Sequence, residues 1–359
     1  MSARLWSIGT ATPAGLITQG EVADLACRVS GENARERALR VIYRRAGVVT
    51  RGSVLVGADG KMEMFEPPPG GSVSGGPTTG ERLAAYPEAA SELARRACET
   101  ALERAGVRAP RVTHLITVSC TGFDAPGVDC ALVASLGLPA TVRRTHVGFM
   151  GCHGAINALA AARAYAEADP SACVLVCCVE LCTLHFQYSD EASVAVANAL
   201  FADGAAAAVV ASGDGPRGSL IVRGVESVII PGTRDCMTWR IGDHGFVMTL
   251  SSRVPEVLAA EVPGWVRGWL PRYGFGVADV RSWAVHPGGP RVVSSVAEGL
   301  GLDASSVSAS REVLAEHGNM SSPTVLFIAE RQWRAGDGAP LVAMAFGPGL
   351  TGEALLLTP

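Results

Sequence analysis

The layout of the sequence repeats once, and this repeat restricts the possible folds more than any other feature. In the first half, a strand-like run ends at Cys120 and Cys152 follows it; in the second half, a strand-like run leads into His286 and Asn319 follows at nearly the same interval. The shift between the halves is 166 or 167 residues. Because this period is far too long for a solenoid, it indicates one duplicated unit, unless the spacings coincide by chance.

Each half reads as alternating strands and helices. Apolar runs bounded by glycine alternate with amphipathic segments in the first half, at 114–120, 154–168, 172–180 and 199–212. Apolar runs without polar alternation are typical of strands buried on both faces of a layered α/β fold. We therefore expect an α/β protein whose N-terminal half spans 1–216 and carries Cys152. The C-terminal half, 217–359, carries His286 and Asn319.

Composition excludes several classes of protein. Hydrophobic residues make up 48% and charged residues 18%, which favours a large core, and the net charge of −4 argues against a nucleic-acid-binding protein. Lys61 is the single lysine and lies near a Pro/Gly-rich stretch, so Schiff-base chemistry is disfavoured. The ten cysteines form no C-x-x-C pair, so neither a zinc site nor a disulfide framework is indicated.

The N-terminus has no signal pattern, and no apolar stretch approaches the length of a membrane span. We expect a soluble, cytoplasmic protein that uses neither a membrane nor nucleic acid.

Cys152 lies in GFMGCHGAIN, where small residues precede a helical run. The unpaired N–H groups of a helix start stabilise a thiolate, and Gly151, Gly154 and Ala155 let an extended acyl thioester approach the backbone. This position favours a nucleophile, although a lone cysteine at a helix start is also a common packing residue.

His286 lies in HPGGP, directly after a strand, and Asn319 lies in HGNMSS, which is typical of a helix start. An imidazole N–H and a carboxamide are suitable donors to an enolate or oxyanion. If the two halves are related by a pseudo-twofold axis, Cys152, His286 and Asn319 meet at the centre of the molecule. Each residue alone is equally compatible with a structural role, and His153, His185 and His317 are other possible bases.

Together these motifs resemble a known family. GFMGCHGA, HPGGPRV, GNMSSPTVLF and FGPGLTGE are similar to the type III polyketide synthases, the chalcone synthase-like enzymes, from about residue 43 to the end. The resemblance implies a duplicated αβαβα thiolase-like fold and a homodimer. Ketoacyl-carrier-protein synthase III enzymes share the fold and a Cys-His-Asn set, but they usually carry a different sequence after the histidine.

The resemblance also implies a role for each motif. Cys152 would hold the starter acyl group and the growing chain, with His286 keeping the sulfur ionised. His286 and Asn319 would stabilise the enolate formed when malonyl-CoA loses CO₂, and Phe201 would be an apolar gatekeeper beside the malonyl carboxylate. Coenzyme A thioesters would be substrates, with no metal or other cofactor implied. Basic residues near the coenzyme A phosphates and pantetheine arm would be Arg40, Arg44, Arg45, Arg51 and Arg291.

By the same resemblance the product cavity would be lined by Cys120, Thr121, Cys182, Leu184, His185, Trp239, Met248 and Ser321. Several positions depart from the plant pattern: Trp239 stands where glycine is usual, His185 where threonine is usual, and Ala125 where a methionine reaches across the dimer. An indole removes a large volume, which argues against chalcone formation itself. Cys120 beside Thr121 is more similar to the bacterial branch, whose products include naphthalenes, pyrones and resorcinols.

The leading hypothesis is therefore an acyltransferase that condenses malonyl-CoA iteratively onto an acyl-CoA starter and cyclises the product to a pyrone, resorcinol or other aromatic. The alternatives are a single-round, ketoacyl-carrier-protein synthase III-like enzyme, a cysteine hydrolase with a Cys-His-Asn triad, and a non-enzymatic scaffold. The sequence does not specify the starter, the number of extensions or the mode of ring closure.

Overall fold

A computed structural model describes residues 2–30, 36–57, 59–67, 75–189, 191–336 and 338–359. Its strands are β1 (Ala3–Ala11), β2 (Leu16–Thr18), β3 (Thr50–Gly52), β4 (His114–Ser119), β5 (Arg143–Gly148), β6 (Cys173–Leu181), β7 (Asp203–Ser212), β8 (Leu220–Ile229), β9 (Met237–Gly242), β10 (Gly245–Leu250), β11 (Ser282–Val285), β12 (Leu341–Gly347) and β13 (Thr351–Thr358). Its helices are α1 (Gln19–Val29), α2 (Glu36–Arg45), α3 (Thr79–Ala84), α4 (Tyr86–Ala105), α5 (Val128–Leu136), α6 (Gly154–Ala168), α7 (Ala192–Leu200), α8 (Val254–Trp269), α9 (Pro290–Leu300), α10 (Ser308–His317) and α11 (Thr324–Arg334).

The strand order shows the duplication directly. The main sheet of the described residues runs β11-β12-β13-β8-β1-β7-β6-β4-β5. Outward from the central β1–β8 pair, each half has two antiparallel pairings followed by one parallel pairing, β1-β7-β6-β4 on one side and β8-β13-β12-β11 on the other. Within the described residues, the first half adds a further strand, β5, at its edge, and the second half adds none. The predicted division at residues 216 and 217 falls in the turn between β7 and β8.

Alternate side chains of one strand belong to different layers, as the period of a strand requires. In β6, Val174 packs with Ile156 of α6 in a central cluster, whereas Leu175 packs with Leu93 of α4 on the opposite face. The free cysteines Cys173, Cys177 and Cys178 are buried in this strand, as predicted.

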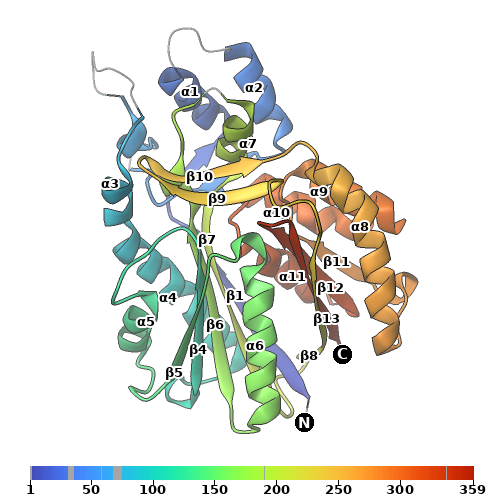
Figure 1. Ribbon diagram of the computed structural model, residues 1–359. Helices are drawn as coiled ribbons and strands as arrows, with labels where there is room; N and C mark the ends of the chain where they lie inside the picture. Colours follow the sequence, from blue (N-terminus) through green and yellow to red (C-terminus); the bar gives the residue numbers. More distant parts are fainter. Residues whose placement is uncertain (1, 31–35, 58, 68–74, 190, 337) are drawn as a thin grey trace.

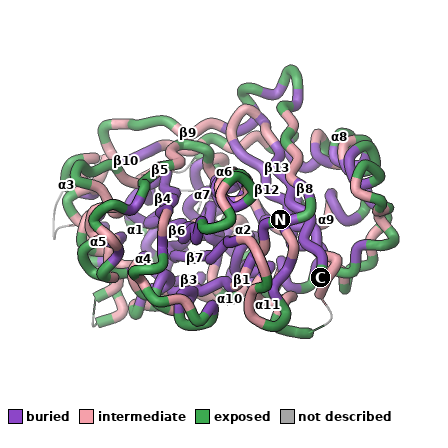
Figure 2. Tube along the Cα trace, turned by 90° about the horizontal axis from the view of Figure 1, so that it is seen from below, coloured by how far each residue is buried: buried purple, intermediate pink, exposed green. Residues whose placement is uncertain are grey.

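The second half repeats this division. Ala343 of β12 faces the central cluster, which contains α11, whereas Val342 packs against α8 and α9. The layers are therefore α4, one half of the sheet, α6 with α11, the other half of the sheet, and α8 with α9 (Figure 1). The predicted αβαβα layering is confirmed. Figure 2 shows the buried strands crossing the interior, with exposed residues mainly on the outer helices and loops.

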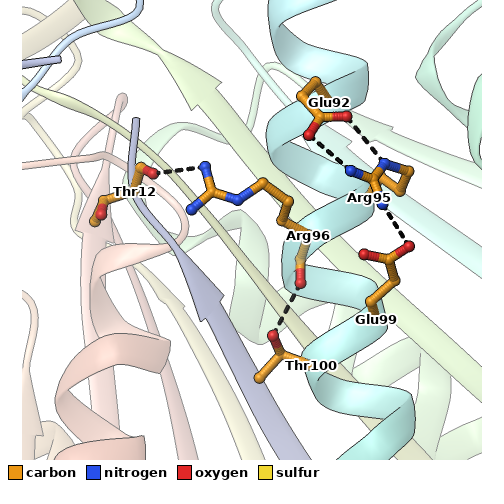
Figure 3. Close-up of polar contacts among 6 residues, drawn as sticks. All are labelled: Thr12, Glu92, Arg95, Arg96, Glu99 and Thr100. Atoms are coloured by element: carbon orange, nitrogen blue, oxygen red, sulfur yellow. Dashed lines mark hydrogen bonds and ion pairs between the residues drawn. The ribbon is translucent and has the colours of Figure 1, made fainter. Parts of the chain in front are cut away.

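The exposed face of α4 carries polar contacts that stabilise the helix locally (Figure 3). Arg95 pairs with Glu92 at 2.7 Å and with Glu99, and Arg96 donates to the carbonyl oxygen of Thr12 at 3.0 Å, just after β1. Solvent-exposed ion pairs contribute little to stability, so the packing of α4 on the sheet determines its position.

One end of the sheet carries a cap. Helices α1, α2 and α7 and the β9–β10 hairpin lie together at the upper end in Figure 1. Strands β4 and β11 run toward this cap, so the residues that follow them lie between the sheet and the cap. In the described residues, no helix is both long and apolar enough to cross a bilayer.

Candidate active site

Cys152 is positioned by a tight turn between β5 and α6. After β5, Phe149 and Gly151 adopt left-handed backbone conformations with φ of 60° and 70°, and a short 3₁₀ turn, Gly151–His153, leads into the helix. A Cβ atom on Gly151 would lie 2.7 Å from Cδ of Pro348, so glycine is required there for both reasons. Cys152 is buried at the start of the helical segment, as predicted.

His286 and Asn319 come from the second half. His286 follows β11, where its backbone N–H donates to the carbonyl oxygen of Met344 at 2.8 Å. Asn319 lies in an extended segment ahead of α11, which begins at Thr324, so the prediction of a helix start at Asn319 is wrong. Its Oδ1 accepts the N–H of Ser321 at 2.8 Å, and its side chain also lies within hydrogen-bond reach of the Cys152 sulfur.

These three side chains line one cavity, which we call the catalytic cavity. Phe201 and Met248 line it as well, and its volume is about 20 Å³. This volume holds about one water molecule, so the site is nearly closed in this conformation. The folded chain thus brings together a sulfur, an imidazole and a carboxamide that are far apart in the sequence.

The other histidines proposed as bases are engaged elsewhere. The ring nitrogens of His153 bond to Asn157 at 2.6 Å and to Thr351 at 2.7 Å, and those of His185 bond to Thr121 and Phe246. His317 pairs with Glu316. His286 is 1% exposed, and neither of its ring nitrogens has a hydrogen-bond partner among the described residues. It is therefore the histidine available to a substrate.

Burial controls the ionisation of the site. It raises the pKa of the Cys152 thiol to about 12, and hydrogen bonds from Ser321 and Asn319 offset only part of the rise. Burial, together with the nearby His153, lowers the pKa of His286 to about 3. Desolvation thus shifts both groups toward their neutral forms and opposes the effect of the helix start on the sulfur. The ionised sulfur that the family resemblance implies stays a prediction.

Phe201 and Met248 separate the catalytic cavity from a second one. This inner cavity has a volume of about 30 Å³ and is lined also by Cys182, His185 and Trp239. Because Phe201 lines both spaces, it stands where a gatekeeper would.

Trp239 and His185 fill the inner cavity in a fixed arrangement. Trp239 donates its Nε1–H to the carbonyl oxygen of Cys120 at 2.7 Å, and its ring meets His185 edge-on at 5.4 Å between centroids. His185 stacks on Phe246 at 4.2 Å, donates from Nε2 to Thr121 and accepts the Phe246 N–H at Nδ1. Burial lowers the pKa of His185 to about 4, which matches this neutral tautomer.

An outer cavity of about 510 Å³ adjoins the catalytic cavity and shares Leu200, Leu250, Val254, Gly288 and Val292 with it. Most of its lining is apolar, and the exposed Arg45 and Arg291 lie on it. An apolar passage with two cations suits a long thioester arm that ends in phosphates.

The other arginines predicted to bind coenzyme A do not lie on the outer cavity. Arg40 is paired with Asp24 and Glu36, and Arg44 lies with it on a separate surface depression. Arg51 is 1% exposed and donates to backbone carbonyls of α7, so its assignment to the coenzyme A phosphates is wrong. Arginine side chains are usually solvated, which is why the sequence did not reveal the burial of Arg51.

The remaining cavity residues divide into two groups. Leu184 packs fully buried in the α4 cluster rather than on the cavities described above, so that prediction is corrected. Cys120, Thr121 and Ser321 line none of the three cavities described above, so these predictions are corrected too. Ser321 contacts Cys120 at 3.7 Å, and Cys120 and Thr121 bind Glu180, a residue that the sequence analysis missed. Glu180 accepts the Cys120 N–H at 3.0 Å and hydroxyl hydrogens from Thr121 and Ser322, each at 2.7 Å. A single carboxylate at the end of the apolar run CVLVCCVEL was the available signal.

Comparison with known proteins identifies the family. Family models described as the N-terminal and C-terminal domains of chalcone and stilbene synthases match residues 1–214 and 222–359. The chain belongs to this family. It is a type III polyketide synthase, a condensing acyltransferase, as the sequence motifs predict, and the single-round alternative is not favoured.

Relatives support this membership over the whole chain. This type III polyketide synthase is 31% identical over 357 residues to the alpha-pyrone synthesis polyketide synthase-like protein Pks18 of Mycobacterium tuberculosis, covering 97% of this chain and 89% of that protein. It is 32% identical to the 1,3,6,8-tetrahydroxynaphthalene synthase of Streptomyces peucetius subsp. caesius, covering 98% and 92%. The crystal structure of PKS-I from the brown alga Ectocarpus siliculosus superposes with a TM-score of 0.90 at 32% identity, covering 99% and 98% of the two chains. The thiolase-like fold is thereby confirmed.

Proposed function

We propose that this enzyme loads an acyl-CoA starter onto Cys152 and extends it with malonyl-CoA, releasing a pyrone or a small aromatic product. In the loading step, the Cys152 sulfur attacks the thioester carbonyl while neutral His286 takes the thiol proton. The tetrahedral intermediate collapses and coenzyme A leaves, receiving that proton. A neutral Cys152–His286 pair is suited to this transfer, because the His286 ring has no hydrogen-bond partner among the residues that the structure describes.

In the extension step, malonyl-CoA loses CO₂ and leaves an enolate on the thioester oxygen. An Nδ2–H of Asn319 and an N–H of His286 donate to that oxygen. The carbanion carbon attacks the thioester on Cys152, which forms the new carbon–carbon bond and releases the sulfur. The lengthened chain, now on coenzyme A, returns to Cys152 for the next round. The ring of Phe201 desolvates the malonyl carboxylate and so favours loss of CO₂.

One observation carries the proposal: Cys152, His286 and Asn319 line the same cavity, and an apolar passage with Arg45 and Arg291 adjoins it. The inner cavity is nearly filled, which supports a short product. The names of the relatives above, an alpha-pyrone synthase-like protein and a naphthalene synthase, support the same product range.

Mixing the purified enzyme with malonyl-CoA and a panel of acyl-CoA starters tests the proposal. We expect release of CO₂ and coenzyme A and the formation of pyrones or phenolic rings, identified by mass spectrometry. Cys152→Ala should abolish product because no other thiol lines the catalytic cavity in the described part of the chain. Condensation by this variant at the wild-type rate would contradict the proposal.

We also propose that the chain acts as a cytoplasmic homodimer. The free cysteines and coenzyme A thioesters suit a reducing interior. Strand β5 is an edge strand, and apolar side chains are exposed in the segments that follow β4 and β5: Phe123 at 73%, Phe149 at 58% and Met150 at 44%. An edge of this kind with apolar neighbours is suited to pairing with a second copy.

A further inference from the structure

The last turn of α7 is held from outside the helix. The final four carbonyls of a helix have no partner within the body of the helix. In α7, each of these four carbonyl oxygens nevertheless accepts a hydrogen bond. The Ala197 oxygen accepts the N–H of Phe201 at 3.1 Å, and the Leu200 oxygen accepts the N–H of Asn319 at 2.8 Å. The Asn198 and Ala199 oxygens accept from Nη1 and Nη2 of Arg51 at 2.8 and 2.6 Å.

Arg51 extends this cap to Phe201. Its Nη1 also donates to the carbonyl oxygen of Phe201 at 2.7 Å, and Nη2 donates to Oε1 of Gln19. Gln19 in turn donates to the oxygens of Ala199 and Tyr43, at 3.0 and 2.8 Å. The guanidinium therefore has a complete and specific set of acceptors on both of its terminal nitrogens.

The charge of Arg51 is stabilised by the end of the helix and by the nearby carboxylate of Asp203. Among the described residues it forms no ion pair with a carboxylate. Instead it lies at the C-terminus of α7, where the carbonyl dipoles present a partial negative charge. Burial lowers the pKa of Arg51 to about 10, so the side chain stays charged at neutral pH.

The same cap includes Asn319. Residues Phe201 and Asn319 form a parallel bridge in which the Ala202 N–H donates to the Asn319 oxygen at 2.9 Å. Gly318 permits this approach, because a Cβ atom there would lie 2.8 Å from Cβ of Ala202. The gatekeeper and the proposed enolate donor are thus attached to one another and to the turn that Arg51 holds.

We propose that Arg51 is a positioning residue for decarboxylation, fixing the Phe201 ring and the Asn319 amide relative to Cys152 through the cap of α7. This inference rests on the proposed function. A lysine at this position would keep the charge. Its single nitrogen, however, would face the acceptors that the guanidinium of Arg51 binds with two terminal nitrogens. The cap would then loosen without losing its charge.

Measuring two half-reactions distinguishes a positioning role of Arg51 from a purely structural one. Starter loading is measured as stoichiometric coenzyme A release from an acyl-CoA alone, and decarboxylation as CO₂ release from malonyl-CoA. We expect Arg51→Lys to lower CO₂ release at least about tenfold while loading stays within about twofold, because displaced donors at the enolate lose most of their effect. A merely structural role would reduce the active fraction and lower both half-reactions equally.

Arg82→Lys is the matched control. Arg82 is 0% exposed and likewise donates to carbonyls, those of Pro77, Leu184 and Phe186, but these are not part of the α7 cap. We expect it to lower the melting temperature as Arg51→Lys does, without changing the ratio of the two half-reactions. An equal change of that ratio in both variants would overturn the inference.

Gln19→Ala decides the question if Arg51→Lys does not fold. It keeps the guanidinium and removes one of its acceptors, so we expect a smaller loss, about threefold, confined to CO₂ release. Parallel loss of loading and decarboxylation, or no loss of either, would overturn the inference. A wild-type enzyme that neither loads a starter nor releases CO₂ would instead refute the proposed function and the inference with it.

Discussion

At the scale of single residues, burial determines which groups are charged. Cys152, His286 and His185 all lie in the interior, and burial shifts the pKa of each toward its neutral form. In the proposed mechanism, the Cys152 thiol therefore transfers its proton to His286 as the substrate reacts.

The alkylation of Cys152 by iodoacetamide tests this state. A thiol whose pKa is raised in the folded protein is protonated at neutral pH, so the inactivation rate should rise about tenfold per unit between about pH 7 and 9. Mass spectrometry of the modified peptide assigns the site. A rate that is already constant below about pH 7 would instead mean that His286 ionises the sulfur in the empty enzyme.

At the scale of elements, the β9–β10 hairpin forms a wall of the inner cavity. Trp239 on β9 projects an indole into the space beside His185, Phe246 and Met248, and its hydrogen bond to Cys120 holds it there. The hairpin thus sets how much room a growing chain finds beyond Phe201.

Trp239→Ala should lengthen the product. Removing the indole leaves a space of the order of 100 Å³, enough for one or two further extension units, and the measurement is the mass distribution of products from one starter. Ile241→Ala is the control, since Ile241 lies on the same strand but is 69% exposed. An unchanged product distribution in Trp239→Ala would show that the inner cavity does not limit chain length.

The positions of helices and strands were predictable from the sequence where a local pattern determined them. The hydrogen-bond partners of individual side chains were not. The spacing of Cys152 and of the strands around it follows from glycine-bounded apolar runs, so β4, α6 and β6 lie where the sequence places them. The partners of Arg51 and Glu180 come from segments more than 30 residues away, and no local period encodes them. Leu184 was misplaced because it lies in a short 3₁₀ turn, Cys182–His185, and packs in the α4 cluster. Asn319 was assigned to a helix start because the helix begins only at Thr324, which the local residues did not specify.

At the scale of the whole molecule, the edge of the sheet next to β5 is the surface most suited to a second copy. Phe149 is 58% exposed there and lies three positions before Cys152. A partner that covers this edge would also support the turn that positions the sulfur.

Light scattering coupled to size-exclusion chromatography tests the dimer. The wild-type chain should elute as a dimer, and Phe149→Asp should shift it toward monomer, because a charge buried in an interface of ~800 Å² per partner is costly. Leu16→Asp is the control: Leu16 is 60% exposed on β2, a strand of a separate two-stranded sheet. A monomeric wild-type chain, or a dimer that Phe149→Asp leaves intact, would contradict this arrangement.

The mirrored order of strands about β1 and β8 is what duplication of one ancestral unit would produce. Two identical ancestral units would have presented each position twice across the axis, with one copy free to diverge. The present chain shows such a division of labour: Cys120 occupies in one half the place that His286 occupies in the other, and Asn319 stands opposite Cys152. Neither half contains all three of Cys152, His286 and Asn319, so the proposed reaction requires both halves in one chain.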